Sequence, residues 1–178
     1  MHGTGIRPDT RSVHDKVSLN RSPKASKRER YDEALVRLGQ LFGSTRDATA
    51  RMSTIAAWLK LEHPQFLWVG FYLLIDSALT VGPYQGFPAC LVLEPHKGVC
   101  WACVDRGVTV MIADVHQFEG HIVCDARARS EMVVPLRDAS GTLVGVLDID
   151  SDEYDTFDDV DREYLDRIVA LVYGREER

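Results

Sequence analysis

The spacing of apolar residues along the chain predicts two helices followed by a run of strands. Over residues 31–42 and again over 45–63, apolar side chains recur every three or four positions, as on one face of a helix. Pro64 ends the second run, because the residue before a proline avoids helical geometry. The next segment, FLWVGFYLLI (66–75), is rich in aromatic and aliphatic residues and is predicted to be a strand buried on both faces.

Shorter apolar stretches predict a meander of further strands, with one helix inside it and one at its end. Strands are expected at 78–86, 88–94 and 108–114, a hairpin at 130–151, helices at 99–105 and 157–173, and a long polar loop at 114–129. The turn of the hairpin is DASG. This order predicts the α+β class, with a largely antiparallel central sheet flanked by helices.

Charge divides the 178 residues into a basic tail, expected to be disordered over 1–28, and one folded domain over 29–178. Residues 1–30 carry eight Lys or Arg and three acids, whereas residues 31–178 carry thirteen and twenty-four. An acidic domain argues against nucleic acid as a partner. No apolar run approaches the roughly 20 residues of a membrane span, so no membrane partner is expected either. Whether the tail is a targeting segment stays open.

The four cysteines all lie within residues 90–124. They are too few and too unevenly placed for a secreted disulfide framework, which favours a cytoplasmic location. Cys100 and Cys103 have the CxxC spacing of a zinc ligand pair, and two free buried thiols on one short helix are the alternative. Residues that might complete a zinc site are Cys90, Cys124, His96, His116 and His121.

Cys124 stands in GHIVCDARARSE, a stretch dense in charged residues. Nearby His121, Arg127 and Arg129 are expected to lower the pKa of its thiol, because positive charge stabilises the thiolate. Asp125 opposes this effect. The alternative is a solvated loop whose thiol has no function.

Three acids are expected to meet at one end of the predicted hairpin. Asp148 and Asp150 lie two apart in a strand and therefore point to the same face of the sheet. Pairing around the DASG turn brings Glu131 beside them. Mutual repulsion should raise the pKa of at least one carboxyl group or attract a bound cation.

Trp68 and Tyr72, four apart in the first strand, share a face with Gly70 between them. The small residue is expected to leave a slot between the two rings. Core packing explains this arrangement as well as a ligand pocket does.

These features together resemble a known family. From Trp68 onward, over about two-thirds of its length, the chain is similar to the free methionine-(R)-sulfoxide reductases, which are built on a GAF domain. The matching motifs are WVGFY (68–72), GPYQGFPAC (82–90), GVC (98–100), DVHQFEGHIVCDARARSE (114–131), VVPL (133–136) and GVLDIDS (145–151). The resemblance implies a GAF-like fold and reduction of free L-methionine-R-sulfoxide, with no cofactor and no metal.

The resemblance also implies a role for each matched thiol. Cys124 would attack the sulfoxide sulfur and become a sulfenic acid, while methionine leaves. Cys90 would resolve it as a disulfide, with Cys100 as a second partner, and thioredoxin would restore the thiols. Two residues depart from the family pattern, since Trp101 replaces a small residue and Cys103 has no expected counterpart.

The implied substrate site uses residues from several segments. Glu131, Asp148 and Asp150 would hold the amino group and polarise the sulfoxide oxygen. By motif, Trp68 and Tyr72 would form the aromatic pocket for the methyl end. The backbone amides of Ile122 and Val123 would bind the carboxylate. A non-catalytic GAF module that binds a small molecule and a zinc-stabilised interaction domain are the competing hypotheses. A homodimer is weakly favoured, because it is the commonest assembly of soluble proteins.

Overall fold

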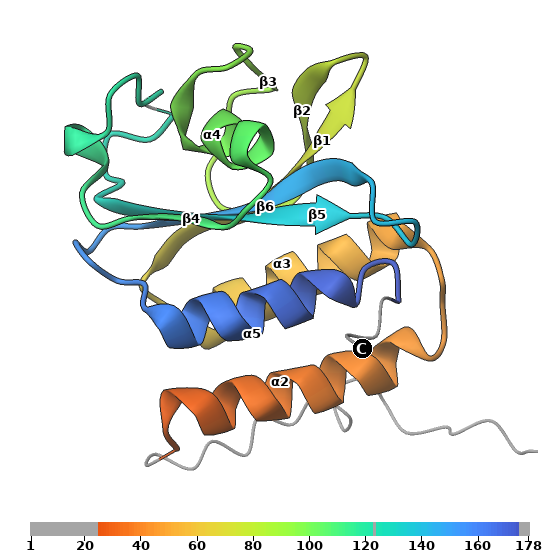
Figure 1. Ribbon diagram of the computed structural model, residues 1–178. Coiled ribbons are helices and arrows are strands. Elements are labelled where there is room, and N and C mark those ends of the chain that lie inside the picture. The colour runs from red at the N-terminus through yellow and green to blue at the C-terminus, as the bar shows by residue number, and fades with distance from the viewer. Residues whose placement is uncertain (1–24, 123, 175–178) are drawn as a thin grey trace, which may run out of the picture.

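The computed structural model describes residues 25–122 and 124–174, and in this part of the chain four α-helices flank one six-stranded sheet (Figure 1). The helices are α2 (Lys27–Phe42), α3 (Ala48–Glu62), α4 (Gly98–Arg106) and α5 (Asp159–Ala170). The strands are β1 (Phe66–Ile75), β2 (Ala78–Gln85), β3 (Val92–Leu93), β4 (Val110–Ile112), β5 (Ser130–Arg137) and β6 (Leu143–Ser151), with a 3-10 turn, η1 (Val115–Gln117). The predicted α+β class is confirmed.

The sheet is antiparallel throughout, in the order β3-β2-β1-β6-β5-β4. Strands β1 and β6 therefore lie at its centre, which explains why most of their residues are buried. The predicted strand at 88–94 shrinks to the two residues of β3, and β4 is also shorter than expected. Both short strands lie at the edges of the sheet, where a strand has only one neighbour to pair with.

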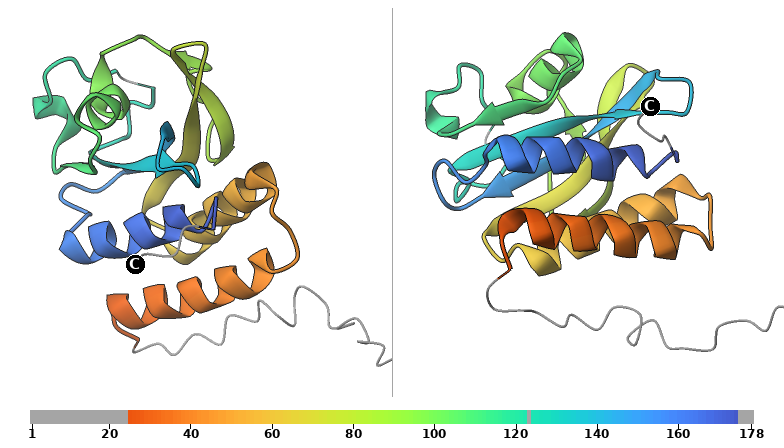
Figure 2. Two further views of the ribbon diagram at one scale, coloured as in Figure 1. Left: turned by 45° about the vertical axis from the view of Figure 1, so that its right-hand side comes forward. Right: turned by 60° about the horizontal axis from the view of Figure 1, so that its bottom comes forward.

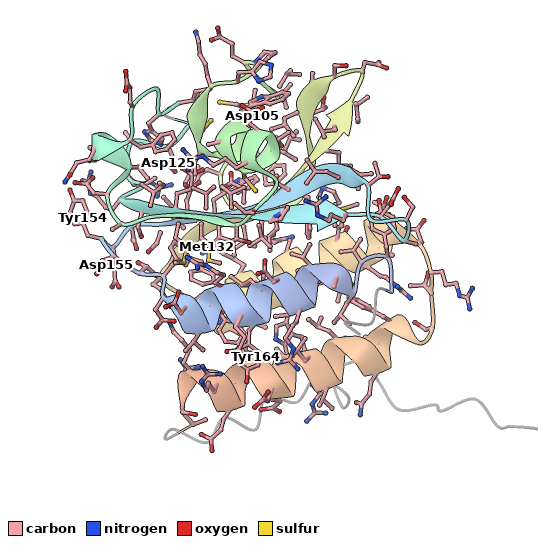
Figure 3. The ribbon with its side chains drawn as sticks, viewed as in Figure 1. Asp105, Asp125, Met132, Tyr154, Asp155 and Tyr164 are labelled. Carbon is pink, nitrogen blue, oxygen red and sulfur yellow. The ribbon has the colours of Figure 1, made fainter. Side chains whose placement is uncertain are left out.

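One face of the sheet packs against helices α3 and α5, and α2 covers this pair from outside (Figures 1 and 2). Met132 points from β5 toward this helical side (Figure 3) and belongs to the large core there, together with Phe66, Phe71 and Leu147. Its neighbour Val133 faces the opposite side, as alternation in a strand requires.

Helix α2 begins at Lys27, two residues before the expected start of the folded domain. Ser26 caps it, because its hydroxyl accepts from the Glu29 amide while the Glu29 carboxylate accepts from the Ser26 amide. The start of α2 is tied to the start of α5, where Lys27 contacts Asp161 and the Tyr31 hydroxyl donates to the same carboxylate at 2.8 Å. Residues 1–24 of the expected tail lie outside the described residues.

The other face of the sheet is covered by α4 and the loops around it (Figure 1). A smaller core lies there, in which Cys100, Trp101 and Cys103 of α4 pack against Val133 and Val146 of the sheet. This layer covers the sheet only in part and leaves room for a pocket. None of the helices in the described residues is long and apolar enough to cross a lipid bilayer.

Candidate active site

A pocket that is open to solvent lies between the sheet, α4 and the loops that precede β3 and β5. Eight of the ten residues predicted from the sequence line it: Trp68, Tyr72, Cys100, Ile122, Cys124, Glu131, Asp148 and Asp150. Cys90 lies beside Cys124, and Val123 is outside the described residues. Segments far apart in the sequence therefore meet at one place.

The three acids converge because of the strand register. Glu131 of β5 lies opposite Asp150 of β6, and Asp150 and Asp148 in turn face Trp68 and Gly70 of β1. All three carboxyl groups point to the pocket side of the sheet, as the two-residue spacing and the hairpin pairing predict. Glu131 and Asp148 are only 6% and 7% exposed.

Burial controls the protonation of these acids. It raises the pKa of Asp148 to about 7, and hydrogen bonds from Cys100 and Glu131 keep that pKa from rising further. The pKa of Glu131 is raised well above its usual value, by burial first and by the charges of Asp148 and Asp150 next. Burial and Asp148 raise the pKa of Asp150 in the same way. At neutral pH the group therefore retains protons that it can donate.

One oxygen of this group has no partner among the described residues. Asp148 Oδ1 is buried without a hydrogen bond. A buried acceptor without a donor costs about 1–3 kcal/mol, so a ligand that brings an N–H or O–H group here would be stabilised. The pocket is therefore suited to a molecule with a cationic or donating head.

Cys124 and Cys90 form a pair of neighbouring thiols. Cys124 is exposed, Cys90 is half-buried, and their side chains are hydrogen-bonded. The protein atoms around Cys124 and then the bond with Cys90 raise the pKa of the Cys124 thiol to about 12. The thiol is therefore protonated at neutral pH in the free protein.

The prediction that nearby cations lower the pKa of Cys124 is wrong, because burial and the contact with Cys90 raise it, and the two arginines are engaged elsewhere. Arg127 makes two hydrogen bonds with Asp125, of 3.0 and 2.6 Å. Arg129 Nη1 lies 2.8 Å from His116 Nε2. Neither guanidinium is therefore free to stabilise a thiolate, and sequence proximity did not reveal these partners.

His121 lies at the edge of the pocket, with Nε2 3.8 Å from Oε2 of Glu131. Burial, and then the charge of His116, lower its pKa, so the imidazole is largely neutral at pH 7 and supplies no charge to Cys124. Lys97 and Phe87 also line the pocket, although the sequence did not point to them. Lys97 precedes the first residue of α4, so recognising this helix start would have suggested it.

Cys100 lies deeper than Cys124, on the first turns of α4. It is buried, and it is hydrogen-bonded to Asp148. Cys103, one turn further along the helix, is also buried but does not line the pocket. Trp101, the departure from the family pattern, is buried, and its ring lies tilted by 49° to that of His96 with ring centroids 5.0 Å apart.

The aromatic residues pack differently from the expected slot. The ring of Trp68 lies across Gly70, where a Cβ atom would overlap it, and stacks between the rings of Tyr72 and Tyr84. The centroid distances are 5.7 and 5.3 Å. The expectation of an empty space over Gly70 is therefore wrong, because the tryptophan itself fills it. The rings of Trp68 and Tyr72 form an apolar wall of the pocket instead.

The zinc hypothesis based on the CxxC spacing finds no matching cluster. In residues 25–122 and 124–174, the one group of close potential metal ligands is Cys100, Glu131 and Asp148. Cys103 and the histidines are not part of it. The spacing of two cysteines on a helix therefore did not identify the atoms that meet in space.

Comparison with known proteins first defines the class. Residues 45–172 match the family model described as a GAF domain. The GAF domain-containing protein A of Dictyostelium discoideum is 37% identical over 84% of this chain and 94% of its own length. The fold, with a pocket under α4 and its loops, is that of a GAF domain.

Two further relatives narrow this class. The free methionine-R-sulfoxide reductase of Escherichia coli (strain K12) is 42% identical over 68% of this chain and 73% of its own length. The X-ray structure of the free methionine-R-sulfoxide reductase from Neisseria meningitidis in complex with its substrate is 35% identical, with a TM-score of 0.78 over 84% of this chain and 89% of that one. This chain belongs to the free methionine-(R)-sulfoxide reductase family.

Proposed function

We propose that the chain reduces free L-methionine-(R)-sulfoxide to L-methionine through a cysteine sulfenic acid and an intramolecular disulfide, which thioredoxin then reduces. The observation that carries the proposal is the Cys124–Cys90 thiol pair at a pocket that also contains three buried acids. Family membership supports the choice of substrate. The thiols supply the two electrons, so the proposed reaction needs no redox cofactor.

The substrate is a zwitterion with an apolar methyl end, and the pocket offers a partner for each part. Its ammonium group would bind among Glu131, Asp148 and Asp150, where the buried Oδ1 of Asp148 needs a donor. Its methyl end would contact the stacked rings of Trp68 and Tyr72. Its carboxylate would bind at the backbone just before Cys124.

The first chemical step transfers oxygen from sulfur to sulfur. Glu131, whose raised pKa keeps it protonated, would donate a proton to the sulfoxide oxygen and make it a better leaving group. Cys124 Sγ attacks the sulfoxide sulfur, and its own proton leaves to solvent. The sulfur–oxygen bond of the substrate then breaks, the hydroxyl passes to Cys124, and the sulfoxide is reduced by two electrons to the thioether.

The second step removes the sulfenic acid. Cys90 Sγ attacks Cys124 Sγ, a disulfide forms, and the hydroxyl leaves as water with the proton of the Cys90 thiol. The hydrogen bond between the two side chains supports Cys90 as the resolving partner. Cys100, beside Asp148 in the interior, would be a second partner. Two thiols of thioredoxin then exchange with the disulfide and return both cysteines to the reduced form.

The test is an assay of the full chain with each epimer of free methionine sulfoxide, and with methionine-R-sulfoxide inside a peptide, with thioredoxin as the reductant. We expect turnover of the free R epimer only, and none after Cys124→Ser. Turnover that survives this substitution would contradict the mechanism. Binding of the R epimer without any turnover by the unaltered chain would favour a non-catalytic GAF binding module.

A further inference from the structure

The interior of the pocket brings together three metal-binding side chains from three different elements. Cys100 of α4, Glu131 of β5 and Asp148 of β6 each offer one ligand atom, and these atoms lie within 4.8 Å of one another. All three residues are buried. Because a helix and two paired strands hold them, their relative positions are fixed by the fold and not by a loop.

In the part of the chain that the structure describes, no Lys or Arg side chain pairs with this cluster. Asp148 is 7% exposed, and its buried Oδ1 has no hydrogen-bond partner among the described residues. Two basic side chains line the pocket. Lys97 pairs with Glu94, and His121, whose imidazole is largely neutral, faces Glu131 from 3.8 Å. An unpaired acidic oxygen at this depth is stabilised by any ligand that brings positive charge.

We propose that Cys100, Glu131 and Asp148 form a binding site for a thiophilic divalent cation, in the first place Zn²⁺, which excludes the substrate's ammonium group from the pocket. A thiolate and two carboxylates are ligands that Zn²⁺ accepts, with bonds of about 2.3 Å to sulfur and about 2.0–2.2 Å to oxygen. Ligand atoms already within 4.8 Å of one another need only side-chain adjustments to reach such distances. Water or Asp150 would supply a fourth ligand.

The thiol selects the metal. Mg²⁺ and Ca²⁺ prefer sites made wholly of oxygen atoms, whereas Zn²⁺ displaces the proton of a thiol and binds the thiolate. The cation and an amino acid's ammonium group would both occupy the space beside Asp148 Oδ1, so they cannot bind there together. This mutual exclusion rests on the proposed function, but the metal site itself does not.

The first test is equilibrium dialysis of the reduced full chain against Zn²⁺. In a second experiment Co²⁺ replaces the Zn²⁺, because Co²⁺ bound to a thiolate has a characteristic absorption band. We expect one ion per chain and a thiolate-to-cobalt band. Cys100→Ser should weaken binding at least tenfold and remove the band, and Asp148→Asn should weaken binding about as much. The thermal unfolding of each variant shows whether it is folded.

Cys103→Ser is the matched control, because Cys103 is equally buried on the same helix but lies outside the cluster. It should bind Zn²⁺ like the unaltered chain. Equal loss in Cys100→Ser and Cys103→Ser would overturn the proposal in favour of a CxxC site, and binding unchanged in Cys100→Ser would overturn it as well.

L-Methionine, the product, tests the exclusion without any turnover. We expect a saturating concentration of it to weaken Zn²⁺ binding at least tenfold, and simultaneous binding of both would overturn the exclusion. Failure of L-methionine to bind the metal-free chain would count against the proposed function. In that case the dialysis and the cobalt band alone would show whether the metal site exists.

Discussion

The hydroxyl of Tyr72 donates a hydrogen bond of 3.1 Å to the backbone carbonyl of Cys90. A second bond of 3.2 Å joins the indole of Trp68 to the carbonyl of Phe87. The two aromatic residues of the pocket wall therefore also hold the segment that carries the proposed resolving cysteine. The proposed contact with the substrate's methyl end and the position of Cys90 therefore depend on the same side chains.

Tyr72→Phe should slow disulfide formation without preventing the first step. The substitution keeps the ring that stacks on Trp68 but removes the bond to the Cys90 carbonyl, a loss of about 1 kcal/mol. Single-turnover mixing followed by mass spectrometry would show methionine released at a near-normal rate and the Cys90–Cys124 disulfide delayed several-fold. Tyr84→Phe removes a hydroxyl from the other ring on Trp68 and should have little effect. Equal delays in both variants would contradict this role of Tyr72.

Serine substitutions should distinguish the thiols that take part in the reaction from those that do not. With the R epimer, Cys124→Ser should give no product, whereas Cys90→Ser should give one methionine per chain and then recycle slowly with thioredoxin. Cys103→Ser should keep normal turnover, because this thiol does not line the pocket. If Cys90→Ser recycled like the unaltered chain, Cys100 would be the main resolving residue.

Gly70→Ala should destabilise the protein and weaken substrate binding. The new methyl group would overlap the ring of Trp68 and Cβ of Tyr84, so the stacked wall must shift. Crowding of this kind costs about 1–3 kcal/mol, measurable by urea unfolding. Gly39→Ala is the matched control, because its methyl group would meet no atom within 4 Å on helix α2 and should stabilise by up to about 1 kcal/mol.

Asp148→Asn should gain stability relative to the unaltered chain as the pH rises. The pKa of Asp148 is raised from 3.8 to about 7, so the folded chain binds a proton that the unfolded chain has already lost. The stability from this group is full below about pH 3.8 and is lost as the pH approaches 7. The difference in unfolding free energy between the variant and the unaltered chain should therefore grow by up to about 1.4 kcal/mol per pH unit.

The unfolding free energies of the two proteins must be compared as a difference, because His63 changes the stability with pH in the opposite direction. Burial lowers its pKa from 6.5 to about 4, so its contribution is full above pH 6.5 and is lost as the pH falls. Both proteins contain His63, so its effect cancels. A difference that stays constant between pH 4 and 7 would show that Asp148 is already ionised in the folded chain.

The parts of the fold that could be predicted are those in which apolar residues recur at a regular spacing along the sequence. The long amphipathic helices and the hairpin at 130–151 follow from periodicity, and the hairpin register then follows from its short turn. The start of α2 was also encoded, because Ser26 and Glu29 have the spacing of a capping box. Edge strands such as β3 have no such signal, since their length depends on the neighbour with which they pair.

The site was predictable to the extent that its residues share a strand or a hairpin. Glu131 and Asp150 face each other because the register leaves no alternative. The pKa of Cys124 was not predictable, because it depends first on burial and then on the contact with Cys90, and neither can be read from a loop sequence. The position of the Trp68 ring was also hidden, since a strand pattern gives the face of a side chain but not its rotamer.

The ties between the beginnings of α2 and α5 have a practical consequence for handling the protein. They fix residue 25 on the layer of helices, while the pocket opens on the other face of the sheet (Figure 1). A chain immobilised on a sensor chip through a linker ahead of residue 25 would therefore present its thiols to the solution. Electrodes or beads coated in this orientation should keep the pocket accessible.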